Sequence, residues 1–252
     1  MEQRGLRPEQ RAVVTGAGSG IGRAIACALA GAGLHVWLVG RNAAKLQRVS
    51  AQISTGAAIL PADITTAQGV DAVAQAAGSA LHVLVHAAGA YLHGKPDHHS
   101  VAEQEALSAV NARAPILLTS ACLPALRAAA GQVVVINSTA ALRPGAENGA
   151  YAASKQALKL ATDALRQEVN GAGIRVLSVF PGRTDTPMQE AVLAAEGRVA
   201  RPETLMRPED VAQMVLAALS VPRTAEVTDI VMRPMRSAQA TAADRPADIG
   251  VT

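Results

Sequence analysis

The fold is decided by residues 11–22, which read RAVVTGAGSGIG. The run from Arg11 to Thr15 is apolar and of strand length, and residues 21–30 place apolar side chains on one stripe of a helix. The glycines therefore lie between a strand and a helix, where backbone N–H groups can approach an anion such as a pyrophosphate. The helix dipole favours negative charge at this point. A tight turn that serves only close packing is the alternative interpretation.

Strand and helix patterns alternate along the rest of the chain. Candidate strands begin near Ala12, Leu34, Ala57, Leu81, Gln132, Ile174 and Val227. This alternation predicts an α/β fold, a parallel sheet of about seven strands with helices on both faces. In such sheets ligands bind at the carboxyl ends of the strands.

Length and composition predict one domain. A chain of 252 residues, half of them apolar, can bury one sizeable core and needs no second domain. We expect the domain to cover residues 11–236, after a flexible N-terminus at 1–10. Residues 237–252 are rich in Ala, Asp, Thr and Pro without periodicity, which predicts a flexible tail.

Tyr151 and Lys155 stand four residues apart in the string YAASK and follow Ser138 by thirteen residues. On a helix this spacing rises about 6 Å along one face, so the ammonium can lie beneath the phenol. A fixed positive charge favours the phenolate and is expected to lower the tyrosine pKa from its usual value of about 10. Such a tyrosine can hand a proton to a carbonyl oxygen. Taken alone, the pair is more typical of an exposed helical face with a partly buried tyrosine, and it is the glycine turn and Ser138 that favour the catalytic interpretation.

Composition and charge argue against several classes of protein. The net charge is +3, but the arginines are spread along the chain and aromatic residues make up 2%, so we expect no nucleic-acid partner. The longest apolar runs are of strand length, which predicts no membrane span. Residues 1–10 are polar and unlike a secretory signal, and we expect a cytoplasmic location.

Cysteine and histidine spacing indicates no metal site. Cys27 and Cys122 lie far apart on apolar helical patterns and are interpreted as small core residues, not as a disulfide. His93, His98 and His99 lie in a polar connection after the fourth strand, where we interpret them as solvated loop residues.

With these motifs in order, the chain resembles the short-chain dehydrogenase/reductase family, in its single-domain branch, from about Arg11 to Pro234. The motifs that carry the resemblance are T-G-x-x-x-G-x-G at residues 15–22, Asp63, Asn111, Ser138, Tyr151 with Lys155, and Pro181-Gly182 followed by Thr186. The resemblance implies a doubly wound, Rossmann-type topology and an NADP-dependent oxidoreductase that interconverts a carbonyl compound and an alcohol. A catalytically idle NADP-binding sensor or scaffold is the alternative function.

The resemblance also implies roles for individual residues. The implied catalytic residues are Asn111, Ser138, Tyr151 and Lys155. Tyr151 gives the proton, Ser138 donates a hydrogen bond to the same oxygen, Lys155 lowers the tyrosine pKa and holds the nicotinamide ribose, and Asn111 anchors a water for proton exchange. The implied cofactor-binding residues are Gly16, Ser19, Gly20, Ile21, Gly22, Arg41, Asp63, Ile64, Ala88, Gly89, Tyr151, Lys155, Pro181, Gly182, Thr184 and Thr186. From the residues alone, Ser138 could start a turn, Asn111 could bend a helix and Asp63 could precede a helix N-cap.

The chain departs from the family's pattern in three places. Residues 86–89 read His-Ala-Ala-Gly where the family usually has Asn-Asn-Ala-Gly, so the side-chain bracing of the sheet must come from elsewhere. Ser19 stands where many NADP-dependent members carry Arg or Lys. Thr184 replaces an aliphatic residue, and we expect the backbone contact there to survive.

The end of the second strand predicts the cofactor. NAD sites place an acid there to bind the ribose 2′-hydroxyl, whereas NADP sites carry Arg for the 2′-phosphate. Between Glu9 and Asp63 the chain has no acidic residue, and the strand ends in Gly40-Arg41. A guanidinium suits phosphate, so we expect NADP(H). A solvated Arg41 at a helix start is the alternative.

The remaining expectations concern a small-molecule carbonyl or alcohol substrate and the assembly. We expect a mainly apolar substrate pocket with contributions from Tyr91, Leu142, Met188, Val192 and Leu193. Arg143 and Arg183 could instead hold a carboxylate. Two helices carry apolar residues on more than the one stripe that would face a sheet, for example Leu117, Leu118, Leu158, Leu160 and Leu165. If exposed, these residues would form a large apolar patch. Because family members usually pair these helices between subunits, we expect a homodimer or homotetramer.

Overall fold

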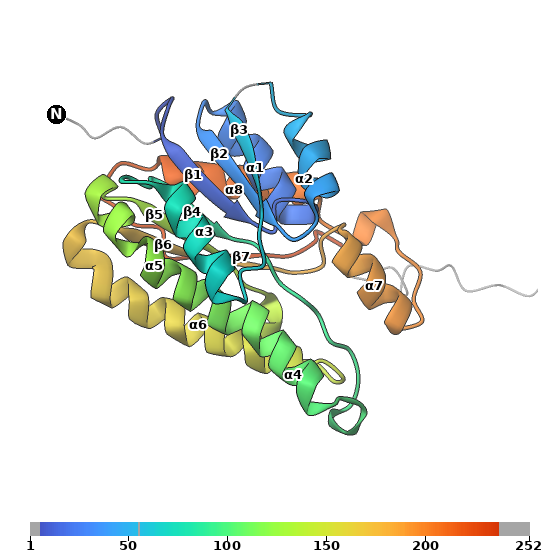
Figure 1. The fold of residues 1–252 in the computed structure, drawn as a ribbon. Helices are drawn as coiled ribbons and strands as arrows, with labels where there is room; N and C mark the ends of the chain where they lie inside the picture. Colours follow the sequence, from blue (N-terminus) through green and yellow to red (C-terminus); the bar gives the residue numbers. More distant parts are fainter. Residues whose placement is uncertain (1–5, 55, 237–252) are drawn as a thin grey trace, which may run out of the picture.

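The computed structural model describes residues 6–54 and 56–236. It contains a seven-stranded parallel sheet in the order β3-β2-β1-β4-β5-β6-β7 (Figure 1). The strands are β1 Arg11–Thr15, β2 His35–Gly40, β3 Ala57–Pro61, β4 Val83–His86, β5 Gln132–Ile136, β6 Arg175–Pro181 and β7 Asp229–Met232. The predicted parallel α/β sheet is confirmed, and each strand begins close to its predicted start. The strand order reverses between β1 and β4, the point at which doubly wound sheets open a crevice for ligands.

Helices cover both faces of the sheet, as predicted (Figure 1). The first core lies between the sheet and α1, α2 and α8, and the second lies between the sheet and α3, α5 and α6. The α-helices are α1 Gly20–Gly31, α2 Ala43–Ser50, α3 Ala67–Ala77, α4 Val101–Ser108, α5 Ala114–Ala129, α6 Gly149–Val169, α7 Pro187–Ala195 and α8 Pro208–Ser220. Shorter helical turns are η1 Pro96–His98, η2 Ala109–Arg113, η3 Thr139–Ala141, η4 Asn170–Ala172 and η5 Pro202–Thr204.

The central strands are apolar throughout because they are covered on both faces. Every residue of β5 and β6 is buried. Such continuous apolar runs are typical of parallel sheets between two helix layers. Helix starts are specified locally: Asn42, Thr66 and Thr186 each accept a hydrogen bond from the backbone N–H three residues on. Cys122 is buried and Cys27 is partly buried, and both are free thiols, as interpreted from the sequence.

Two side chains brace β1 and β4 where the family pattern differs. Thr15 Oγ1 donates to the carbonyl of Val85 at 3.2 Å and accepts from the N–H of Ala87 at 3.1 Å. His86 is buried, and its Nε2 lies 2.7 Å from Thr119 Oγ1 on α5. Burial lowers the pKa of His86 to about 3, so the ring is neutral and acts as a hydrogen-bonding spacer between strand and helix.

The segments α4, η2 and α5 follow one another without a break as a single helix, Val101–Ala129, in which η2 is a π-helical turn. Within the described part of the chain, it is the one helix long and apolar enough to cross a membrane by length and composition. It packs against α3 and α6 and covers one face of the sheet (Figure 1), as core helices that pass the same test do. The predicted absence of a membrane partner therefore stays a prediction.

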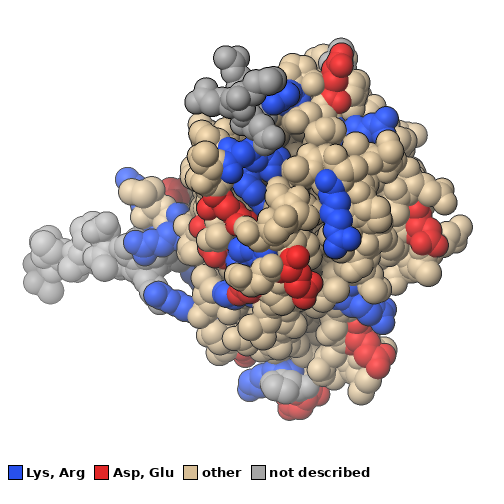
Figure 2. All heavy atoms as spheres, turned by 90° about the vertical axis from the view of Figure 1, so that its left-hand side faces the viewer, with Lys and Arg blue, Asp and Glu red and all other residues tan. Residues whose placement is uncertain are grey.

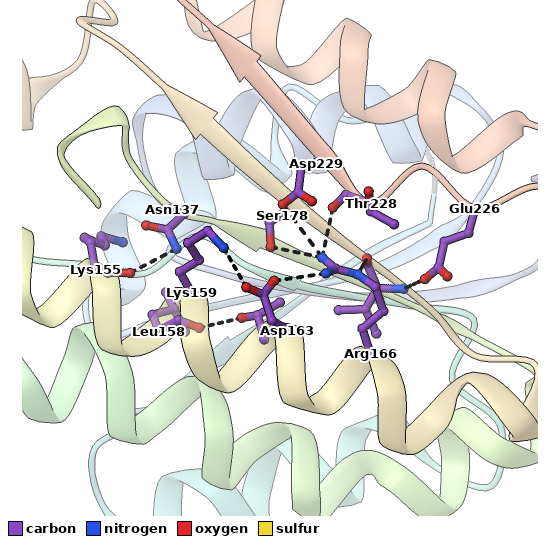
Figure 3. Close-up of polar contacts among 12 residues, drawn as sticks. Asn137, Lys155, Leu158, Lys159, Asp163, Arg166, Ser178, Glu226, Thr228 and Asp229 are labelled. Carbon is purple, nitrogen blue, oxygen red and sulfur yellow. Dashed lines mark hydrogen bonds and ion pairs between the residues drawn. The ribbon is translucent and has the colours of Figure 1, made fainter. Parts of the chain in front are cut away.

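A buried arginine fixes α6 to the sheet (Figure 3). Arg166 Nε donates to the carbonyl of Val176 at 3.0 Å, and Nη2 donates to the carbonyl of Thr228 at 3.0 Å. Its Nη1 donates to Asp163, which also accepts from Lys159 at 2.6 Å. The helix that carries Tyr151 and Lys155 is thereby held against β6 and the segment before β7.

The surface view of one face shows basic and acidic side chains interspersed, without a continuous basic stripe on that face (Figure 2). A stripe of this kind is what a nucleic-acid backbone would require. The expected flexible tail at 237–252, and the first five residues of the expected flexible N-terminus, lie outside the described residues.

Candidate active site

One cavity of about 850 Å³ lies at the carboxyl ends of the strands, where the strand order reverses. Its walls come from the turns that follow β1, β2, β3, β4, β5 and β6. All the predicted cofactor-binding residues line it, together with Ser138, Tyr151 and Lys155. Among the predicted site residues only Asn111 does not. A volume of this size suits a cofactor with a small substrate.

The glycine turn between β1 and α1 forms one wall of the cavity. Gly16 has φ +68, and a Cβ there would lie 2.7 Å from the N atom of Ala88. A Cβ on Gly22 would collide with the carbonyl of Gly16. Helix α1 has no side-chain cap at Ser19 and no acidic residue in its first turn. Its first N–H groups therefore have no side-chain cap at the edge of the cavity, and a helix start of this kind can bind an anion.

A positive edge lies at the end of β2. Arg41 is exposed at the cavity rim, directly after Gly40, the last residue of β2. Lys45, on the first turn of α2, lines the same part of the cavity and was not predicted. A signal was present, because Lys45 follows Arg41 by four residues.

Asp63 follows β3 and faces the same end of the cavity. Its Oδ1 accepts hydrogen bonds from the hydroxyl of Thr65 at 2.7 Å and from the N–H of Thr65 at 2.9 Å. These bonds, with a smaller contribution from the charge of Arg41, lower the pKa of Asp63. Its main-chain carbonyl accepts from Thr66, the N-cap of α3, so the alternative of an approach to a helix N-cap also describes its position.

Tyr151 lies on the first turn of α6 and is 8% exposed. Burial raises the pKa of Tyr151, and a hydrogen bond with Ser138 lowers it to a smaller extent. The net direction is opposite to the predicted lowering by Lys155. The reason is desolvation: the phenol is buried, and burial disfavours its charged form. Tyr151 is therefore held as the neutral phenol, beside Ser138.

Lys155 is buried one turn further along α6. Its Nζ donates to the carbonyl of Ile136 at 3.0 Å, at the end of β5. Burial lowers the pKa of Lys155 to about 8. The backbone of the same residue is held by Asn137, whose Nδ2 donates to the Lys155 carbonyl at 3.1 Å (Figure 3).

Asn137 links the two parts of the site and was missed in the sequence. Its Oδ1 accepts from the N–H of Ser138 at 2.9 Å, while its Nδ2 holds the backbone of Lys155. One buried amide thus sets the end of β5 against α6. Its position next to Ser138 was the available signal. Ser138 itself starts the helical turn η3 by accepting from the N–H of Ala140, so its turn role and its place in the site coexist.

Asn111 is fully buried in the π-helical turn η2. Its amide exchanges two hydrogen bonds of 2.9 Å with the backbone of Ala90 and donates to Ser154 Oγ at 3.0 Å. A Cβ on Gly89 would lie 3.1 Å from Asn111 Oδ1 and 3.6 Å from Lys155 Nζ, so the three meet at the base of the cavity. Asn111 fixes the loop after β4 to α6, and it lies in the irregular helical turn that the alternative interpretation expected.

The substrate side of the cavity only partly matches its prediction. Tyr91, Met188 and Val192 line it, whereas Leu142 and Leu193 are not among the described residues that do. Leu193 is buried, and Leu142 is 40% exposed.

The two arginines at the mouth also differ from each other. Arg183 Nη2 donates to both carboxylate oxygens of Glu196 at 2.8 Å, so its charge is already paired. Arg143 lines the cavity and is exposed. Of the two, Arg143 is the one whose charge faces solvent at the mouth.

The interpretation of all three loop histidines as solvated was wrong for His93. Its ring stacks on Tyr91 with centroids 6.2 Å apart, and its Nε2 lies 3.6 Å from Glu147. His98 is exposed as expected. His99 is half-buried with its Nε2 shielded from solvent, so the interpretation was wrong for this residue too. A polar connection can still fold back over a site, and composition does not reveal this. No cluster of three or more His, Cys, Asp or Glu side chains suited to a metal occurs within residues 6–54 and 56–236.

The sequence of this chain is similar to those of known dehydrogenases and oxidoreductases. The family model described as short chain dehydrogenase matches residues 10–197. An uncharacterised oxidoreductase of Staphylococcus aureus is 35% identical over 229 residues, which are 89% of this chain and 96% of the relative. An uncharacterised oxidoreductase of Staphylococcus epidermidis is 31% identical over 231 residues, 90% of this chain and 98% of the relative.

Solved structures agree with the sequence comparison. A metagenomic short-chain oxidoreductase in complex with NADP has a TM-score of 0.78 at 33% identity, covering 91% of this chain and 99% of its own. A 3-ketoacyl-(acyl-carrier-protein) reductase from Brucella melitensis complexed with NADH has a TM-score of 0.82 at 27% identity, with the same coverage of 91% and 99%.

Proposed function

The chain belongs to the short-chain dehydrogenase/reductase family of oxidoreductases, and on this premise we propose that it uses NADP(H) to interconvert a carbonyl compound and the corresponding alcohol. The observation that carries the proposal is the meeting of Tyr151, Ser138 and Lys155 in the cavity that the glycine turn also lines. A screen of NADPH consumption against aldehydes, ketones, keto acids and keto esters tests it. Turnover of any of them would exclude the alternative of an idle sensor or scaffold.

The chain's own residues fit a dinucleotide along the length of the cavity. The N–H groups at the start of α1, which has no side-chain cap, suit a pyrophosphate. Gly16 and Gly22 are needed for the close packing of this turn, because a Cβ at either would meet the protein's own backbone. Asp63 and Ile64 line the end of the cavity nearest β3, beyond Arg41. The nicotinamide end would be held by Lys155 and by backbone and side-chain groups of Ala88, Gly89, Pro181, Gly182, Thr184 and Thr186.

The proposed chemistry is a proton transfer matched to a hydride transfer. When bound, the nicotinamide supplies or accepts the hydride at the reacting carbon. Tyr151, held neutral by burial, donates its proton to the carbonyl oxygen in the reductive direction and accepts it in the oxidative direction. Ser138 donates a hydrogen bond to the same oxygen. Lys155 holds the ribose, and its ammonium lies near the buried Asn111, since both approach Gly89.

Cofactor preference is the first testable consequence. We expect kcat/KM with NADPH to exceed that with NADH by at least ~10-fold, about 1.4 kcal/mol, because Arg41 and Lys45 stand where a 2′-phosphate would lie and no carboxylate replaces Gly40. The double variant Gly40→Asp with Arg41→Ile is expected to reverse the order. Steady-state kinetics with both cofactors measures it.

The double variant is a fair test because the site tolerates it. A Cβ on Gly40 would meet only Leu46 Cδ2 at 3.5 Å, an ordinary contact. Arg48 lies on the same helix α2 outside the cavity, so Arg48→Ile controls for the loss of a nearby positive charge. A wild-type preference for NADH would contradict the interpretation of β2.

A second prediction, assembly into a homo-oligomer, rests on exposed apolar residues of α5 and α6. Leu117 on α5 and Leu160 on α6 are 49% and 66% exposed. Leu118 and Leu158 are buried and Leu165 packs on the core, so these three were wrongly expected at the surface. Together with Ile116 and Val101, the exposed pair leaves four large apolar side chains exposed on the helices α4 to α6.

We expect the mass of a dimer or tetramer by light scattering at micromolar concentration. Leu117→Glu with Leu160→Glu places two charges in the apolar surface and is expected to shift the mass toward the monomer. Met214→Glu, on the far helix α8 and 42% exposed, is the matched control. A monomeric wild type would refute the assembly.

A further inference from the structure

The two tyrosines of the chain meet at the substrate side of the cavity. The ring of Tyr91 lies edge-on to the ring of Tyr151, with centroids 4.9 Å apart and an angle of 62° between planes. Tyr91 lines the cavity and is half-buried. A substituent on this side of a carbonyl bound at Tyr151 would therefore pack against Tyr91.

Tyr91 is held from behind by His93. The Tyr91 hydroxyl lies 3.4 Å from His93 Nδ1, and the two rings stack with an angle of 21° between planes. On its other side, His93 Nε2 lies 3.6 Å from a carboxylate oxygen of Glu147. Neither His93 nor Glu147 belongs to the described lining of the cavity, so both act on it through Tyr91.

Glu147 joins two loops that are distant in sequence. Besides its contact with His93, its carbonyl accepts from the N–H of Gly94 at 2.8 Å. Glu147 has φ 60, a left-handed conformation that is costly for a residue with a side chain and persists where surrounding contacts hold it. The loop after β4 is thus tied to the loop that precedes α6.

We propose that Tyr91, His93 and Glu147 form a clamp that fixes one wall of the substrate pocket and limits the size of the substituent a substrate can carry on that side. This inference rests on the proposed carbonyl reductase function. Two further lining residues, Arg183 and Glu196, are paired with each other at 2.8 Å, whereas Arg143 keeps an exposed charge at the mouth. A substituent beside Tyr151 would meet the ring of Tyr91, so the clamp favours a small one. A wall residue that is positioned by such supporting contacts sets specificity without taking part in the proton transfer.

The test uses alkyl phenyl ketones from acetophenone to valerophenone with NADPH, in the full-length enzyme. In Tyr91→Ala, the ratio of kcat/KM for valerophenone to that for acetophenone is expected to rise by ~10-fold or more, because several methylenes no longer meet the ring. In Glu147→Gln, the same ratio is expected to rise by ~3-fold through KM, with kcat for acetophenone within ~2-fold of wild type. His98→Gln, in the same connection but exposed, is the matched control and is expected to change neither.

NADPH fluorescence confirms that each variant is folded. If Tyr91→Ala fails to bind NADPH, Tyr91→Phe replaces it, since it keeps the ring, loses only the contact of the hydroxyl with His93 Nδ1 and is expected to behave as Glu147→Gln does. Unchanged ratios in folded variants would overturn the clamp while leaving the proposed function standing. Absence of wild-type turnover on every carbonyl class would overturn both.

Discussion

Replacement of Tyr151 by Phe is expected to lower kcat for carbonyl reduction by at least ~10³-fold and to leave cofactor affinity near that of the wild type. The ring is 8% exposed and packs against Tyr91, so Phe fills the same space. What is lost is the hydroxyl that contacts Ser138 and that burial keeps protonated. No other described phenol lines the cavity except Tyr91, whose hydroxyl is directed to His93.

The measurement is steady-state turnover in both directions, with NADPH binding followed by fluorescence. Intact binding with lost turnover in both directions is the expected pair of results, because one group gives the proton in reduction and takes it in oxidation. A loss smaller than tenfold on an active substrate would remove Tyr151 from the proton-transfer role.

Replacement of Lys155 by Met is expected to lower turnover by at least ~10²-fold and weaken cofactor binding, yet raise the melting temperature. Lys155 is 5% exposed, and burial lowers its pKa from 10.5 to about 8. A buried ammonium therefore costs the folded state on the order of 3 kcal/mol at pH 7. Methionine keeps the aliphatic length without the charge, and part of that cost is recovered as a few degrees in Tm. The rest of that cost is not recovered, because the variant also loses the hydrogen bond from Lys155 Nζ to the carbonyl of Ile136.

The sign of the pH dependence makes this test sharper. The folded pKa lies below the unfolded value, so the destabilisation is fully present below about pH 8 and is relieved as the pH rises toward 10.5. The difference in Tm between Lys155→Met and wild type is expected to shrink over that window. Lys159→Met is the control: this lysine lies one turn further on α6, is paired with Asp163 and stands outside the cavity. A Lys155→Met enzyme with unaltered cofactor affinity would contradict the ribose role.

Much of the fold was predictable because its signals are local. Strands β5 and β6 are buried on both faces. Strands in a parallel sheet between two helix layers therefore have unbroken apolar runs in the sequence. The glycine turn was equally readable, since close packing of the protein backbone excludes every residue except glycine at Gly16 and Gly22. The order and spacing of the motifs then identified Ser138, Tyr151 and Lys155 as candidate site residues. All three line the same cavity.

Predictions that depended on neighbours fared less well. Leu117 and Leu118 are adjacent in sequence, yet one is 49% exposed and the other is fully buried. Arg183 was considered as a ligand for a carboxylate, but Glu196, thirteen residues away, already occupies it. His93 looked like a solvated loop residue because its neighbours in sequence are polar, and only the fold brings Tyr91 and Glu147 against it.

The sequence by itself determined the sheet, the glycine turn, the positive residue after β2 and the candidate groups that line the cavity, because periodicity, backbone freedom and residue chemistry are properties of short segments. Only the tertiary structure decided how those groups titrate and what surrounds them. Lys155 was expected to lower the pKa of Tyr151, but burial raises that pKa and lowers that of Lys155 to about 8. Desolvation of these two groups results from contacts with β5, α6 and the loop after β4 together. It therefore cannot be predicted from any one segment of the chain.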